Sequence, residues 1–167
     1  MFRTLNDFAA DFASERDGTL KILDALTDEA LQQSVAQDHR TIGRMCWHIV
    51  TSYPEMMGRA GLTISTIDEH APMPTTAREI RNSYAATSQM LLDEVIKNWT
   101  DAVLLEERDM YGVSWQNGFT LEVLIRHEVH HRAQMTVLMR QAGLKVPGVY
   151  GPALEEWSTF GMPAPLV

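Results

Sequence analysis

Three of the six histidines in this chain, His127, His130 and His131, lie close together in the sequence. If this segment is helical, His127 and His131 project about 40° apart around the axis and about 6 Å apart along it. Two imidazoles in this arrangement can bind one divalent metal ion at about 2.0–2.1 Å. His130 is the rival second ligand, but its helical neighbours form a more mixed face. We therefore predict a metal site with His127 and His131 as ligands.

A third histidine on another segment strengthens this prediction. A buried imidazole without a partner costs about 1–3 kcal/mol, and a shared cation removes that cost for several rings together. His48 is the natural third ligand, because it lies between Met45 and Ser52 on the expected core side of a helix. The alternative is ordinary packing, in which each ring is a hydrogen-bonded core residue. The expected core-facing line of the C-terminal histidine segment is Leu124, His127, His131, Met135 and Leu138.

The same segment matches a second motif, because residues 127–131 have the HExxH pattern of zinc metalloproteases. Glu128 would then be the general base, and Glu155 or Glu156 a further ligand. The chain upstream shows no strands for a protease sheet, glycines and prolines separate the motif from both glutamates, and His48 would have no role. A metalloprotease is therefore the less favoured alternative.

Apolar residues repeat at helical spacing through most of the chain, and none alternates convincingly over strand length. The pattern predicts four long helices, with Thr41, Thr76 and Thr120 as N-caps of the last three. Pro54 predicts a kink or an early end in the second helix. Residues 104–111 are compatible with a short strand or a helical turn. The expected helices cover about 4–26, 41–58, 76–99 and 120–142.

Four helices without a convincing sheet predict an all-α four-helix bundle. The connection over residues 61–75 is long enough, at about 3.3 Å per residue, to span a helix of about 24 Å. It therefore permits parallel second and third helices. The Gly- and Pro-containing tail from Val146 holds Tyr150 and Trp157 and is expected to pack on the bundle. We predict one domain over residues 1–167.

The composition excludes several classes of function. A formal net charge of −8 and a pI of about 5.1 argue against a nucleic-acid partner. The single cysteine, Cys46, excludes a disulfide framework and a cysteine-cluster zinc site, and it fits a cytoplasmic protein. The chain has no apolar run of 18 residues, so no membrane span is predicted. The expected partner is a small-molecule substrate.

Nearly the whole chain resembles the DinB/YfiT-like family of metal-binding four-helix bundles. The resemblance rests on Ile42-Gly-Arg-Met-Cys-Trp-His48, His127-Glu-Val-His-His131-Arg-Ala-Gln134 and the stretch over residues 139–152. It implies an up-down-down-up topology, one divalent ion bound by His48, His127 and His131, often zinc or nickel, and a homodimer. Better understood relatives are S-transferases and an isomerase that use low-molecular-weight thiols. Ala133 stands where the family usually has glycine.

Three neutral ligands would leave a divalent ion its full charge and an open position, where bound water has a pKa near 7 and a thiol is deprotonated. The sequence thus predicts a metal-dependent enzyme that activates a thiol or water, with Glu128 as the candidate catalytic proton acceptor. Arg132 and Gln134 are candidate supports of the ligands. Glu128 is otherwise a solvated helix residue. The alternatives are a non-catalytic metal-binding stress-response bundle and, less favoured, a small-ligand carrier.

Overall fold

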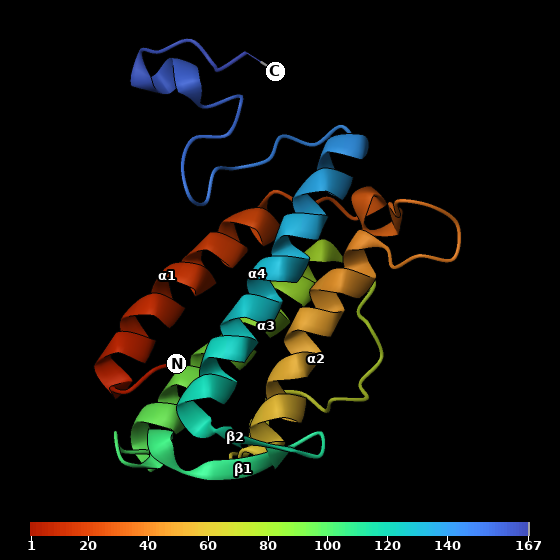
Figure 1. Cartoon of the computed structure of the whole chain (residues 1–167). Helices are drawn as coiled ribbons and strands as arrows, with labels where there is room; N and C mark the ends of the chain where they lie inside the picture. The colour runs from red at the N-terminus through yellow and green to blue at the C-terminus, as the bar shows by residue number, and fades with distance from the viewer. Residues whose placement is uncertain (167) are drawn as a thin grey trace.

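The computed structural model describes residues 1–166, and four helices dominate the chain (Figure 1). The helices are α1 (Leu5–Asp24), α2 (Ile42–Arg59), α3 (Ala77–Asn98) and α4 (Asn117–Gln141). Three short 3₁₀ helices are η1 (Glu29–Gln32), η2 (Val103–Leu105) and η3 (Trp157–Phe160). Two four-residue strands, β1 (Glu107–Met110) and β2 (Val113–Gln116), form the sheet. The predicted all-α bundle is confirmed, with one small hairpin added.

Threonine caps begin three of the four helices. The hydroxyl of Thr41 accepts a hydrogen bond from the backbone N–H of Arg44, and that of Thr76 accepts one from Glu79. Both predicted caps are confirmed, and Thr4 caps α1 in the same way. Each such cap satisfies an N–H group that the first helical turn leaves without a partner.

The predicted start of α4 at Thr120 is wrong, because the helix begins three residues earlier, at Asn117. The cause is a tertiary contact. The backbone N–H of Asn117 donates to the carbonyl of Glu106 at 2.9 Å, and its side-chain amide donates to the carbonyl of Val103 at 3.0 Å. Contacts with the preceding segment therefore anchor the first turn of α4, and Thr120 lies inside the helix.

Of the two effects expected of Pro54, a kink or an early end, the early end is wrong, since α2 continues to Arg59. Proline removes one backbone donor from the helical ladder. The donor that Pro54 lacks would serve the carbonyl of Val50, so the proline removes one hydrogen bond from the ladder and the helix continues past it.

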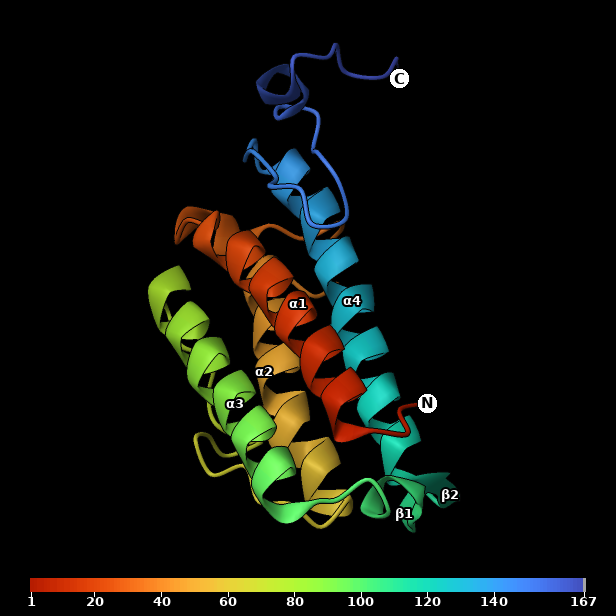
Figure 2. The same ribbon diagram turned by 90° about the vertical axis from the view of Figure 1, so that its left-hand side faces the viewer.

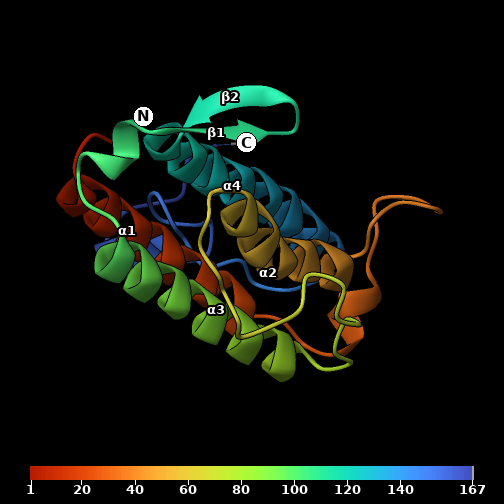
Figure 3. The same ribbon diagram turned by 90° about the horizontal axis from the view of Figure 1, so that it is seen from below.

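The helices run up, down, down and up, as Figures 1 and 2 show together. The chain after α2 returns along the length of the bundle before α3 starts, so α2 and α3 are parallel. The view along the bundle in Figure 3 shows α2 beside α4 and α1 beside α3. The predicted topology is confirmed, and it places α2 next to the histidine-bearing helix α4.

The core is centred on aromatic rings from three helices. Phe8 and Phe12 of α1 stack at 5.4 Å, Phe12 contacts Tyr53 of α2 at 6.1 Å, and Tyr53 contacts Tyr84 of α3 at 6.1 Å. All four residues have no exposed surface. Within residues 1–166, none of the helices combines the length with the apolar character that a membrane span requires.

The segment that the sequence left undecided forms η2 and the antiparallel β1–β2 hairpin. Its turn residues Tyr111 and Gly112 have φ values of 60° and 84°, which fits a two-residue turn with both φ values positive. The Tyr111 hydroxyl donates to Glu55 of α2 at 2.7 Å, and the guanidinium of Arg59 lies 4.5 Å from the Tyr111 ring centre. These contacts fasten the hairpin tip to α2.

The tail that follows α4 first packs on α1 and α4. A Cβ on Gly18 of α1 would lie 2.6 Å from a methyl carbon of Val149, so glycine permits this close approach. Tyr150 contacts Arg132 of α4 and Glu15 of α1. The later part, including η3, extends past the end of the bundle (Figures 1 and 2). The expected packing of the tail thus holds through Tyr150, and Glu155 makes one further contact with the bundle through its ion pair with Arg140 of α4.

Candidate metal centre

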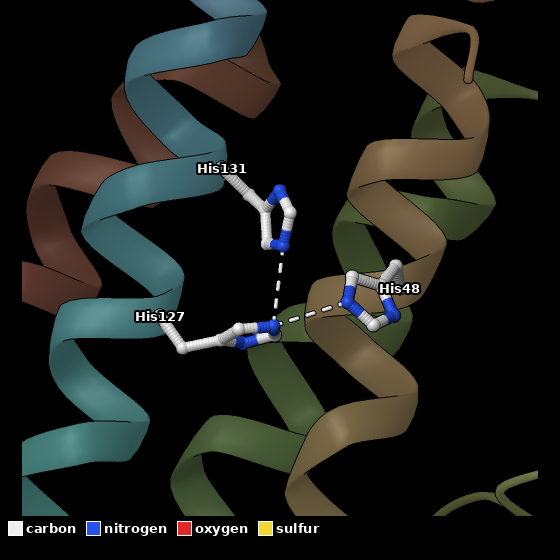
Figure 4. A group of neighbouring side chains, drawn as sticks. All are labelled: His48, His127 and His131. Atoms are coloured by element: carbon white, nitrogen blue, oxygen red, sulfur yellow. Dashed lines mark hydrogen bonds between the residues drawn. The ribbon is translucent and has the colours of Figure 1, made fainter. Parts of the chain in front are cut away.

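The imidazoles of His48, His127 and His131 converge between α2 and α4 (Figure 4). The Nε2 atom of His127 lies 3.0 Å from that of His48 and 3.1 Å from that of His131. One ligand atom from each ring lies within 4.8 Å of the other two. The predicted meeting of histidines from two helices is therefore observed.

The donor set fits a metal ion better than it fits hydrogen bonding among the rings. A ring nitrogen has either one hydrogen or one in-plane lone pair, so Nε2 of His127 can satisfy only one of its two neighbours. A single cation accepts all three lone pairs. Ligands at about 2.0–2.1 Å in tetrahedral geometry lie about 3.3 Å apart, close to the two separations that His127 makes with His48 and His131.

A hydrogen bond from Gln134 fixes the orientation of one ligand. The Oε1 atom of Gln134 lies 2.7 Å from Nδ1 of His131, so Nδ1–H donates to the amide oxygen. The neutral ring then has its lone pair on Nε2, which faces the other histidines. This contact places Gln134 where the suggested supporting role would require it.

Burial keeps the three rings neutral. It is the main cause that lowers the pKa of His48 and of His127 to about 4, with Arg40 adding to the effect at both rings. Burial also lowers the pKa of His131, against an opposing contribution from Gln134. Neutral imidazoles at pH 7 are the form that binds a metal ion.

These pKa shifts predict how the metal-free protein responds to acid. Free imidazole titrates near pH 6.5. Between about pH 6.5 and pH 4 the unfolded chain therefore binds protons that the native rings do not. The stability that these rings contribute should be fully present above about pH 6.5. The free energy of unfolding should then fall as the pH is lowered through that window. Urea unfolding of chelator-treated protein at pH 7 and pH 5 measures this loss.

The matched variant for this prediction is His127→Ala, which removes one group with a lowered pKa. Its unfolding free energy should fall less between pH 7 and pH 5 than that of the wild-type protein. An equal loss in both proteins would show that other groups cause the acid sensitivity.

His130 does not join the cluster, which contains His131 in its place. Nor do the two downstream glutamates supply a ligand to it. Glu155 forms an ion pair with Arg140, and Glu156 accepts hydrogen bonds from the backbone N–H groups of Gly148 and Ala153. The geometry that an HExxH protease needs is therefore not formed among these residues.

Glu128 is only 1% exposed, so it is not the solvated helix residue of the alternative interpretation. Its carboxylate accepts hydrogen bonds from Thr19 of α1 at 2.5 Å, from Tyr84 of α3 at 2.5 Å and from Tyr53 of α2. All four helices thus meet at one carboxylate. The role of Glu128 as a proton acceptor stays a prediction, and this geometry favours a part in holding the bundle together.

A groove of about 850 Å³ opens beside His48 and meets the cluster at that ring. Thr51, Glu55 and Arg59 of α2 line it, together with Tyr111 of the hairpin. Sequence reasoning missed the groove residues. The sequence signals for the hairpin were the possible short strand over residues 104–111 and the turn residue Gly112, and nothing in the sequence indicated that the turn would lie against α2.

The up-down-down-up bundle with histidines on its second and fourth helices defines a class of proteins, and the comparisons identify it. A sequence model described as "DinB family" matches residues 1–164, and the chain belongs to that family. The family resemblance inferred from the histidine segments is therefore confirmed.

Individual relatives agree with this assignment. The chain is 44% identical over 165 residues to the uncharacterized protein YrdA of Bacillus subtilis (strain 168), covering 99% of each. A DinB-like protein from Bacillus cereus ATCC 10987 has a crystal structure with a TM-score of 0.85 and 42% identity, covering 90% of this chain and 100% of that one. The DinB-like protein YjoA of B. subtilis shares the fold at 17% identity, with a TM-score of 0.68 and coverage of 86% and 97%.

Proposed function

We propose that this protein binds one divalent metal ion through His48, His127 and His131 and is an enzyme that activates a thiol or a water molecule. The observation that carries the proposal is the convergence of three Nε2 atoms from two helices. Zinc and nickel are the metals we propose, because neutral imidazole suits both.

Different residues would serve different roles in such a site. The three neutral rings would hold the ion, and Gln134 keeps the His131 lone pair directed toward it. When bound, a divalent ion with three neutral ligands lowers the pKa of a coordinated water or thiol. The groove beside His48 admits the substrate from solvent.

We propose a thiol as the preferred nucleophile, on the strength of the family resemblance. The reaction class is then S-transfer, in which the sulfur forms a bond to an electrophilic carbon while the bond from that carbon to its leaving group, such as chloride, breaks. The thiol proton and the leaving group both go to solvent. Hydrolysis is the other reaction that the same ligands support. The groove favours catalysis over a metal that only joins α2 to α4, because a purely structural site has no need of access.

Thiol consumption tests this proposal. Metal-loaded protein, with a low-molecular-weight thiol and an electrophile such as monochlorobimane, is expected to form the conjugate faster than the metal-free protein. The His131→Ala variant should show no metal-dependent rate. A fully metal-loaded protein without activity toward a panel of thiols, and without hydrolase activity, would favour the non-catalytic metal-binding bundle.

A further inference from the structure

A second, smaller cavity lies directly against the histidine cluster, bounded by α2, α4 and the hairpin and open on one side. Its volume is about 190 Å³, and we name it the hairpin cavity. His48 and His127 form the side toward the cluster, so a group inside it would adjoin an ion held there. The remaining wall consists mainly of Met56, Tyr111, Trp115 and Val123.

Aromatic packing holds this wall in place. The ring of Trp115 packs edge-on against Tyr111 at 6.1 Å and against Phe119 at 5.2 Å. Tyr111 is anchored to α2 through its hydrogen bond to Glu55 and through the Arg59 guanidinium above its ring. The hairpin therefore presents a fixed aromatic surface to the cavity.

The polar groups at the edge of the cavity already have partners. One oxygen of Glu55 accepts from Arg59 at 2.7 Å, and the other accepts from Tyr111 at 2.7 Å. The hydroxyl of Ser52 donates to the carbonyl of His48. With these groups engaged, the cavity offers little to recognise a charge and favours an apolar guest.

The volume limits what that guest can be. An engineered apolar cavity of about 150 Å³ holds benzene. A cavity of about 190 Å³ therefore suits a single six-membered ring or a branched alkyl group of similar size.

We propose that the hairpin cavity binds a ring-sized apolar group of a small molecule whose metal-binding end lies at the histidine cluster. This inference rests on the proposed function, since the ion would hold the polar end. It assigns Trp115 and Val123 as specificity-determining residues and gives the hairpin a role in substrate selection.

Two thiols that differ in their apolar group test the proposal on protein loaded with cobalt(II). Phenylmethanethiol and ethanethiol are titrated separately, and the sulfur-to-cobalt absorption band reports binding of each. The cavity should make the phenyl compound bind at least about tenfold more tightly. Val123→Phe fills the cavity and should remove this advantage, while the affinity for ethanethiol should stay within about twofold.

Val137→Phe is the matched control, because Val137 lies on the same helix but is 58% exposed and does not line the cavity. It should behave like the wild-type protein. If Val123→Phe fails to fold, Trp115→Ala replaces it and should lower the phenyl preference by removing one wall.

The outcomes separate this inference from the proposed function. An ethanethiol band with no preference for the phenyl compound contradicts the cavity assignment alone. Equal weakening of both thiols in the Val123→Phe protein contradicts it as well. Absence of a band with either thiol contradicts both the cavity assignment and the proposed open coordination position.

Discussion

Replacement of His131 with alanine is expected to lower the affinity for zinc more than about 100-fold while the bundle stays helical. Loss of a residue that only supports a ligand already costs about 10–100-fold, and here a ligand itself is removed. Both ring nitrogens of His131 have a neighbour in the site. Its Nε2 atom lies 3.1 Å from Nε2 of His127, and its Nδ1 atom lies 2.7 Å from Oε1 of Gln134. Equilibrium dialysis against a zinc buffer measures the affinity, and circular dichroism verifies the fold.

His130→Ala is the control, because His130 is adjacent in sequence and lies outside the cluster. Its zinc affinity should stay within about threefold of the wild-type value. If the His131→Ala protein retained full zinc binding, or if only the His130→Ala protein lost it, the ligand assignment would be wrong.

The second large effect is expected on stability, from replacement of Arg132 with methionine. Arg132 is 2% exposed and joins α1, α4 and the tail. Its guanidinium lies 2.5 Å from the Glu15 carboxylate and donates to Thr19 at 3.0 Å and to Tyr150 at 2.6 Å. Removing one partner of a buried ion pair costs about 3–5 kcal/mol.

The lower end of that range applies because the Glu15 side chain keeps 16% exposure and can gain hydration when Arg132 is lost. We expect the free energy of unfolding to fall by about 3 kcal/mol, which corresponds to a decrease of about 6–12 °C in Tm. Urea and thermal unfolding measure the loss, and limited proteolysis should cut the tail near Tyr150 sooner than in the wild-type protein.

Arg126→Met provides the comparison on the same helix. Arg126 is exposed and pairs with Glu122 four residues away, an arrangement that contributes about 0.5 kcal/mol or less. Its stability should therefore be nearly unchanged. Equal losses in the two variants would contradict the role assigned to the buried guanidinium.

The sequence predicted the three histidines because helical geometry alone aligns His127 with His131, and because His48 lies on a clear apolar stripe. It predicted Thr41 and Thr76 as caps for a similarly local reason, since a cap bonds to its own first turn. These features depend on neighbours within one helix, so periodicity is sufficient to find them.

The hairpin and the Glu128 network were not predictable in the same way. The strands are four residues long and mostly exposed, so they carry no alternating apolar pattern. The partners of Glu128 come from three different helices, and spacing along one helix does not identify them. Both features depend on tertiary contacts, and the hairpin forms part of the cavity beside the candidate metal centre.

The most direct test of the central proposal is the zinc X-ray absorption spectrum of protein that binds one zinc per chain. The three convergent histidines predict imidazole scattering from three rings with nitrogen at about 2.0–2.1 Å, together with at least one further light-atom ligand at the open position. A spectrum with one imidazole or none, or with sulfur from Cys46 as the main ligand, would contradict it.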